Sequence, residues 1–200
     1  MRWKLHWSPT SPYVRKVMVA AHELGLAGRL DLVPTRVETV VADVAGDNPL
    51  GRIPVLVLPD GTTLFDSLVI AEFFDVAGGG ALFPRAGPAR WRTLTLHALG
   101  HGAIDATIAI VGEGRRPAAE RSPAFLAARQ AEIGRALDAL ERAPLAATPD
   151  IATITAAVAL GYLEFRLPEF VWRPARPRLA AWSDDFAKRP SMEATKPAAL

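Results

Sequence analysis

The chain of 200 residues has no cysteine, few histidines and no long apolar run. Without cysteine, disulfides, thiolate metal sites and a cysteine nucleophile are excluded. The four histidines are scattered, so we expect no metal site. The longest apolar run, Ile151 to Leu163, is broken by threonines and is shorter than the roughly 20 residues that cross a bilayer. The first residues also lack the apolar stretch of a secretory signal, so we expect a soluble, cytoplasmic protein with no membrane partner.

Charges of one sign are not concentrated anywhere in the chain. It has 23 Lys plus Arg against 21 Asp plus Glu, a net charge of +2, and the basic residues are scattered. Proteins that bind nucleic acids gather Lys and Arg on one face, so we expect no nucleic-acid partner. Half of the residues are apolar, which is enough for a sizeable core in one large domain or two small ones.

The first part of the chain alternates between strand-like and helix-like patterns. Trp3, Leu5 and Trp7 alternate with polar residues, which is typical of a half-buried strand. Apolar residues at helical spacing then run from Val14 to Leu24. A second strand, "LDLVPT", follows, and its Pro34 must lie at the end or edge of a sheet. A right-handed crossover makes these two strands parallel.

Two further strands and a helix complete this region. Short apolar runs flank Pro59-Asp60-Gly61, a tripeptide of residues typical of turns. This pattern predicts an antiparallel hairpin. A helical pattern follows from Ser67 to Ala77. The predicted order is therefore βαβ and then ββα.

The rest of the chain consists of a predicted linker followed by helical patterns. The segment 78–88 is dense in glycine and proline and predicts a linker. Beyond it, helical patterns cover four segments: Arg90 to about Val111, Ser122 to about Arg142, Asp150 to Arg166, and a last one around Leu179, Trp182 and Phe186. The third is apolar nearly all round, as a helix in the middle of a bundle must be. We therefore predict an α/β domain over 1–77, a linker over 78–88 and an all-helical domain over 89–200.

Four motifs in this order carry a resemblance to a known family. They are "SPTSPYVRK" (Ser8 to Lys16), "NPLGRIPVL" (Asn48 to Leu56), "FDSLVI" (Phe65 to Ile70) and the tail from Pro177 to Pro197. Together with the layout, they resemble the soluble, cytosolic-type glutathione S-transferases, and specifically a bacterial serine-type member. The resemblance implies a thioredoxin-like N-terminal domain, an all-α C-terminal bundle, a homodimer, and glutathione as co-substrate.

The resemblance also assigns roles in binding glutathione. It places the γ-glutamyl carboxylate at Ser67, where a helix start offers free N–H groups, and the γ-glutamyl amine near Asp66. Either residue also fits a plain N-cap. It implies a cis bond before Pro54, with the Ile53 backbone pairing with the cysteinyl part. Arg52 is placed to reach the glycyl carboxylate, or else is a solvated loop cation.

A hydroxyl beside the first helix is the candidate for activating the glutathione thiol. A hydroxyl that donates a hydrogen bond to sulfur at a helix N-terminus favours the thiolate. Ser11 is the first choice, with Thr10 and Ser8 as alternatives, because serine-type classes differ in where the serine stands. Tyr13 lies one step past the helix start and is a poor candidate. Ser11 followed by proline is also a strong helix start, so one residue can cap the helix and hold the thiolate.

Three functions fit these residues. The first is an enzyme, a transferase of alkyl or aryl groups that conjugates glutathione to an apolar small-molecule electrophile. The second is a non-catalytic protein that binds glutathione or a hydrophobic ligand, and the third is a protein-interaction module. Because the chain has no cysteine, reduction through a protein thiol is excluded. The second substrate is expected between the two domains, against the helix from Arg90 to Val111.

A few other residues carry expectations of their own. His97 and His101 lie one turn apart, and we expect a polar helix face or a dimer contact rather than a metal pair. Arg15 and Lys16 are expected to be solvated. Asp150 is expected to cap the buried helix, with a hydroxyl at the third position where the family has a carboxylate.

Overall fold

The computed structural model describes residues 2–36 and 38–197 and divides into two compact units. The first comprises the residues up to Arg85 and the segment from Pro190 onward, and the second runs from Ala86 to Arg189. Met1, Val37 and residues 198–200, which the predicted domain ranges include, lie outside the described residues. Part of the predicted linker belongs to the first unit, where the Leu82 N–H donates to the carboxylate of Asp75.

The first unit is built on a four-stranded sheet with the order β2-β1-β3-β4. Its strands are β1 (Trp3–Trp7), β2 (Leu30–Pro34), β3 (Val55–Val57) and β4 (Thr63–Leu64). β1 pairs with β2 in parallel and with β3 antiparallel, and β3 and β4 form an antiparallel hairpin. The parallel first pair, the hairpin and the position of Pro34 at the end of an edge strand are therefore confirmed.

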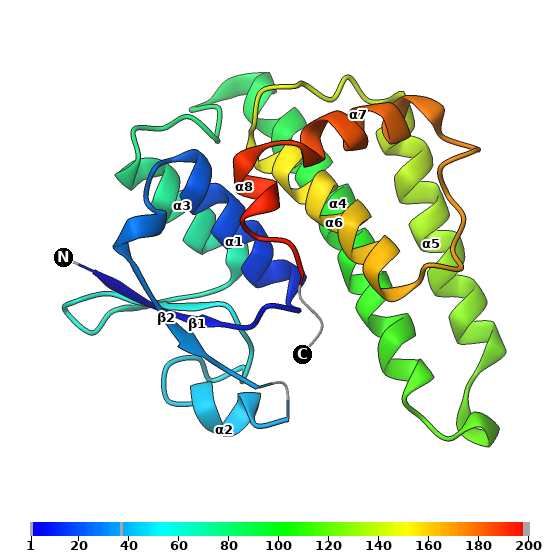
Figure 1. Cartoon of the computed structure of the whole chain (residues 1–200), viewed down its shortest axis with the longest axis horizontal. Helices are drawn as coiled ribbons and strands as arrows, with labels where there is room; N and C mark the ends of the chain where they lie inside the picture. Colours follow the sequence, from blue (N-terminus) through cyan, green and yellow to red (C-terminus); the bar gives the residue numbers. More distant parts are fainter. Residues whose placement is uncertain (1, 37, 198–200) are drawn as a thin grey trace. The chain divides into compact units, whose positions relative to one another are not determined.

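Helices cover both faces of this sheet, as Figure 1 shows. α1 (Pro12–Glu23) and α3 (Ser67–Ala77) lie on one side, and the short α2 (Val40–Val44) lies on the other. The predicted order lacked α2, since five residues are too few to establish a helical period. The side chains of α1, α3 and the sheet form one core, which includes Trp3, Leu5, Val14, Val17, Ile70 and Phe74. The thioredoxin-like fold is confirmed.

The segment after Pro190 belongs to the first unit, although the sequence placed it with the helices of the second. Its helix α8 (Pro190–Glu193) packs against α1. Met192 is 2 % exposed. The Ser191 hydroxyl donates to the carboxylate of Glu23 near the end of α1. These contacts tie the end of the chain to a helix near its beginning.

Two cations on α1 are buried, so the expectation that they are solvated was wrong. Lys16 is 0 % exposed and Arg15 is 9 % exposed. The Arg15 guanidinium donates to the carbonyl of Met192 at 3.2 Å. Burial lowers the pKa of Arg15 to about 10, and the nearby carboxylate of Glu193 opposes that shift. For Arg15 the expectation failed because α8 packs on α1 and supplies the Met192 carbonyl, a contact that the spacing of residues along α1 does not reveal.

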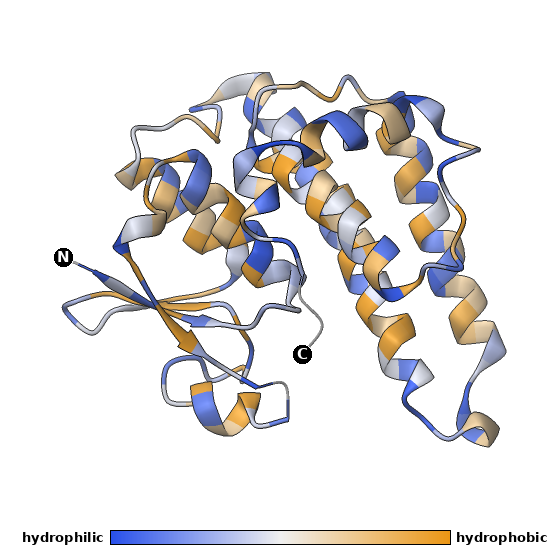
Figure 2. Cartoon of the chain, in the orientation of Figure 1, coloured by the Kyte–Doolittle hydropathy of each residue, from blue (hydrophilic) through white to orange (hydrophobic). Residues whose placement is uncertain are grey.

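The second unit consists of helices. They are α4 (Gly87–Gly114), α5 (Pro123–Arg142), α6 (Ile151–Arg166) and α7 (Pro177–Ala187), and α4 packs against both α5 and α6. Figure 2 shows largely hydrophobic to neutral residues along α6, which agrees with the prediction of a helix buried all round. The all-α bundle is confirmed.

The central helices of this unit, α4 and α6, pack closely, and α6 begins with a reciprocal N-cap. A Cβ on Gly100 in α4 would meet Thr155 and Ala156 of α6 at 3.1–3.2 Å, so the two backbones approach closely there. Asp150 caps α6: its carboxylate accepts from the Thr153 N–H at 2.8 Å, and its own N–H donates to the Thr153 hydroxyl at 2.8 Å. A hydroxyl at the third position therefore still completes the reciprocal cap.

By length and composition, α4 is the one helix within the described residues that passes the test for crossing a membrane. Such a test also selects the core helix of a soluble protein. In this structure, α4 packs against α5 and α6.

Candidate functional site

The pairing of the strands brings the three glutathione motifs of the first unit to one edge of the sheet. His6, one residue before the end of β1, pairs with Val55 at the start of β3. The segment before β3 therefore lies beside the start of the β1–α1 loop. In the hairpin, Leu64 pairs with Leu56, so the chain beyond β4 runs toward that same segment. Residues far apart in the sequence thus converge at the beginnings of α1 and α3.

The start of α1 has the geometry of a serine cap. Ser11 has an extended backbone (φ −82°, ψ 120°), Pro12 is the first helical residue, and the Ser11 hydroxyl oxygen accepts from the Val14 N–H at 3.3 Å. A hydroxyl that accepts in a cap keeps its own hydrogen for donation. Ser11 is half-buried. Its O–H can therefore serve a ligand while its oxygen holds the helix start.

The two alternative hydroxyls are placed differently. Ser8 is 2 % exposed, and its hydroxyl lies 3.4 Å from that of Thr10. The Ser8 carbonyl accepts from the Ser11 N–H at 3.3 Å, so the segment turns back on itself before the helix. Thr10 is half-buried, like Ser11. Burial and the contact with Thr10 make Ser8 the least accessible of the three.

The loop before β3 is closed by a single side chain. The Asn48 amide donates to the Arg52 carbonyl at 2.8 Å, and its oxygen accepts from the Leu50 N–H at 3.0 Å. The Ile53–Pro54 bond is cis, as the resemblance implied. Arg52 is exposed and Pro54 is buried. The loop therefore presents a cation to solvent beside a fixed backbone turn.

The start of α3 provides free backbone donors. Asp66 is the N-cap, and its carboxylate accepts from the Leu68 N–H at 2.9 Å. Ser67 is the first helical residue and is buried, whereas Asp66 is exposed. The prediction that Ser67 begins this helix is confirmed. Such a helix start attracts carboxylates through its free N–H groups and the positive end of its dipole.

One polar cluster next to this edge was missed by the sequence analysis. His6 was expected on the solvent side of a half-buried strand, but it is 9 % exposed. Its Nε2 lies 3.0 Å from the Asp47 carboxylate, and its Nδ1 lies 3.4 Å from the Thr35 hydroxyl. The sequence offered one signal for this cluster, the aromatic and titratable His6 among the residues of a strand. Such a residue does not by itself predict burial.

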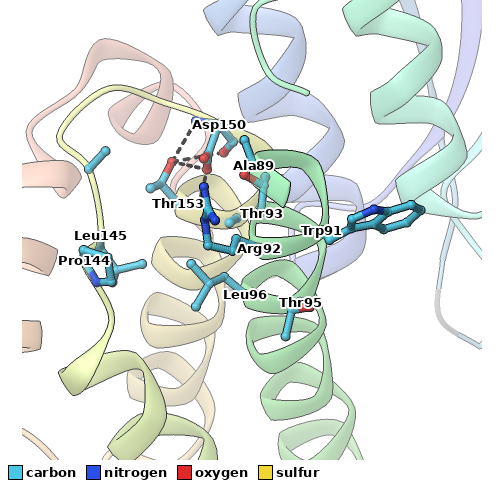
Figure 3. Close-up of a pocket in the computed structure, with 12 residues that line it drawn as sticks. Ala89, Trp91, Arg92, Thr93, Thr95, Leu96, Pro144, Leu145, Asp150 and Thr153 are labelled. Atoms are coloured by element: carbon cyan, nitrogen blue, oxygen red, sulfur yellow. Dashed lines mark hydrogen bonds between the residues drawn. The ribbon is translucent and has the colours of Figure 1, made fainter. Parts of the chain in front are cut away.

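The second unit contains an open pocket of about 510 Å³ between the start of α4, the α5–α6 connection and the start of α6. Figure 3 shows Arg92, Asp150 and Thr153 gathered at one end, with Leu96 and Leu145 among the other lining residues. The ring of Trp91 points away from them. None of the residues that the resemblance assigned to glutathione lines this pocket.

The histidines of α4 do not form part of a metal-binding group. Among the described residues, no cluster of three or more His, Cys, Asp or Glu side chains could hold a metal ion. The rings of His97 and His101 have centroids 5.4 Å apart, and His101 faces Asp105 at 3.8 Å. His97 is 5 % exposed, which disagrees with the expected polar helix face, and the alternative of a dimer contact stays a prediction.

Comparison with known proteins gives consistent matches along the chain. Residues 10–77 match the model of the glutathione S-transferase N-terminal domain, and residues 123–185 match that of the C-terminal domain. The chain is 35 % identical over 201 residues to the uncharacterized GST-like protein YibF of Escherichia coli K12, covering 97 % of this chain and 98 % of that protein.

Solved structures agree with these matches. A glutathione transferase family member from Pseudomonas fluorescens Pf-5, crystallised with bound glutathione, is 44 % identical with a TM-score of 0.95, covering 98 % of this chain and 100 % of that one. A second structure of a family member from that organism, with bound S-(propanoic acid)-glutathione, is 43 % identical with a TM-score of 0.91 over the same shares.

Proposed function

The chain belongs to the glutathione S-transferase family, and from this premise we propose that it binds glutathione and transfers the thiolate to an apolar small-molecule electrophile. The observation that carries the proposal is the convergence, at one sheet edge, of a serine-capped helix start, a closed loop bearing a cation and a second helix start. Glutathione has two carboxylates and one thiol, and this edge offers a partner for each.

The two ends of glutathione have complementary partners in the proposed mode. The γ-glutamyl carboxylate lies at the N-terminus of α3, where the N–H of Ser67 and the helix dipole favour an anion. Asp66 stands beside the γ-glutamyl amine as a counter-charge. Arg52, exposed at the other side of the cis-Pro54 turn, pairs with the glycyl carboxylate. The backbone of Ile53 pairs with the cysteinyl part, as one strand pairs with another.

Ser11 is the proposed donor to the sulfur, which makes the protein a serine-type member. A free thiol has a pKa of about 8.5, so only a small fraction is thiolate at neutral pH. An O–H donor at the positive end of α1 favours the thiolate over the thiol. Ser11 and Thr10 are both half-buried, whereas Ser8 is buried against Thr10, and of the three only Ser11 caps α1. The proposed nucleophile is therefore the glutathione sulfur.

Conjugation is favoured over binding alone by one comparison. A relative binds glutathione whose sulfur carries a propanoic acid group. That molecule has the form of a product of adding glutathione to an electrophile. A non-catalytic protein for glutathione or hydrophobic ligands, or an interaction module, is the alternative outcome of the experiment below. We further propose a homodimer, which light scattering of the purified chain tests, and a cytoplasmic location, which fractionation of cells that contain the protein tests.

The test measures binding and turnover separately. Titration calorimetry with glutathione and with S-methylglutathione is expected to show binding of both. Turnover of a panel of aryl halides and activated alkenes is expected with glutathione and not with S-methylglutathione, which has no free thiol. Binding without turnover of any electrophile in the panel supports the non-catalytic alternative. Absence of binding overturns both readings.

A further inference from the structure

We propose that His6 is a positioning residue, which holds the glutathione loop in place through Asp47. The inference deepens the proposed function and rests on it, because the loop in question carries Arg52 and cis-Pro54. His6 itself is buried in the sheet and has no assigned contact with glutathione.

The tether has two links. The first is the contact of 3.0 Å between His6 Nε2 and the Asp47 carboxylate, which joins β1 to the residue that opens the loop. The second is Asn48, the next residue, whose side chain bonds both the Arg52 carbonyl and the Leu50 N–H. Since Asp47 and Asn48 are neighbours in the chain, a shift of one moves the other. The position of Arg52 thus depends on a histidine in the central strand.

Both charge states of His6 satisfy the buried hydrogen bonds. The Thr35 hydroxyl lies 3.4 Å from His6 Nδ1 and 3.2 Å from the Val33 carbonyl, and it has one hydrogen to donate. When His6 is neutral with its hydrogen on Nε2, Thr35 donates to Nδ1. When His6 is protonated, Nδ1 donates to the Thr35 oxygen, and Thr35 donates to Val33. The rotation of one hydroxyl therefore gives His6 Nδ1 a partner in either charge state.

The carboxylate makes this a strong tether. A hydrogen bond with an ionised acceptor is roughly twice as strong as one between neutral groups. The Asp47 side chain is 39 % exposed, so its partial hydration reduces this gain without removing it. Two other carboxylates, on β2 and α2, have partners of their own: Asp31 binds Arg2, and Asp43 accepts from Thr39.

Rescue by a conservative variant separates this role from simple packing. S-methylglutathione is the probe, because it keeps both carboxylates and has no thiol to titrate. Asp47→Asn keeps an oxygen acceptor for His6 and loses the charge. It is expected to bind the probe with an affinity between those of the wild type and Asp47→Ala.

Removal of the tether gives a larger effect. Asp47→Ala is expected to weaken binding of S-methylglutathione by about tenfold, the loss of one hydrogen bond to a charged group. Asp43→Ala is the matched control, because it removes a carboxylate of α2 whose hydrogen-bond partner is Thr39. It is expected to leave the affinity unchanged. Equal affinity in Asp47→Ala and the wild type overturns the proposal.

A second measurement tests the tether without any ligand. Amide hydrogen exchange of Leu50 and Gly51, whose N–H groups bond the side chain and carbonyl of Asn48, reports the order of the loop. Asp47→Ala is expected to accelerate this exchange, and Asp43→Ala is not. Unchanged exchange in Asp47→Ala overturns the inference, whatever the ligand does. If the wild type does not bind the probe but the exchange responds as stated, the proposed function fails and the tether stands.

Discussion

Asn48 donates its side-chain amide to the backbone carbonyl of Arg52 at 2.8 Å and closes the loop that the proposal assigns to glutathione. Asn48 is 2 % exposed, so water does not replace this bond easily. The same side chain accepts from the Leu50 N–H at 3.0 Å. One buried amide therefore fixes the backbone on both sides of Gly51, the glycine with positive φ in this turn.

Substitution of Asn48 is expected to weaken glutathione binding through this loop. Asn48→Ala loses both bonds and leaves the Arg52 carbonyl and the Leu50 N–H without their partner. Each such loss costs about 1–3 kcal/mol, so we expect the dissociation constant for glutathione to rise by about tenfold or more. Asn48→Asp keeps the acceptor for Leu50 but cannot donate to Arg52, and we expect an intermediate value. Calorimetric titration measures both, and equal affinities in all three proteins would contradict the assignment.

The two proposed roles of Ser11 can be separated by substitution. Ser11→Ala is expected to lower the free energy of unfolding by about 1 kcal/mol through loss of the cap, and kcat/KM by about tenfold or more through loss of the donor. Ser11→Asp caps a helix as well as serine does, but its negative charge opposes a thiolate. We therefore expect Ser11→Asp to fold stably and to be inactive.

Matched variants at the neighbouring hydroxyls complete this test. Thr10→Val and Ser8→Ala are expected to retain most of the activity. The pH profile of kcat/KM is expected to move to higher pH in Ser11→Ala, because the thiol of bound glutathione loses the donor that lowers its pKa. If Thr10→Val abolishes turnover and Ser11→Ala leaves it unchanged, the threonine is the donor.

Two glycines in α4 are expected to respond in opposite directions to alanine. A Cβ on Gly100 would meet the Thr155 side chain at 3.1 Å and backbone atoms of α6 at 3.2 Å, whereas a Cβ on Gly102 would meet nothing within 4 Å. Gly100→Ala forces α4 and α6 apart, and we expect it to destabilise the protein by about 1–3 kcal/mol. Gly102→Ala is expected to stabilise it by about 0.5–1 kcal/mol through helix propensity. Urea unfolding measures both, and equal midpoints would show that the helices are not in close contact.

The contact of α8 with α1 is expected to contribute to stability. Met192 is 2 % exposed, so Met192→Ala leaves a cavity against α1, and we expect a loss of about 2–5 kcal/mol. Lys196→Ala is the control, because this side chain is 61 % exposed and forms an ion pair with Glu193. Exposed pairs contribute about 0–1 kcal/mol. Thermal unfolding of the two variants tests the difference, and a small effect of Met192→Ala would mean that α8 is not held on α1.

Much of the fold and part of the site could be predicted from local chemistry. A serine before a proline marks the start of α1 at Pro12, and the helical pattern from Ser67 marks the start of α3. The Pro59-Asp60-Gly61 turn predicts the β3–β4 hairpin. In each case the deciding interactions join residues a few positions apart, so the sequence is enough. The cis bond before Pro54 needed the family resemblance, because an X–Pro bond has no strong local preference for cis.

The amino-acid sequence by itself determined the elements, their order, the caps and the family, because these depend on residue types at short spacing. Only the tertiary structure decided which polar side chains are buried. Arg15 and Lys16 lie on what the helical pattern indicates is an exposed face, yet both are buried. Arg15 contacts the carbonyl of Met192 in α8, more than 170 residues later in the chain. The alternation of residues along β1 places His6 on the side predicted to face solvent. In the structure, Thr35 and the segment after α2 cover it. Periodicity identifies the face of an element, but burial depends on what packs against that face, and distant parts of the chain supply it.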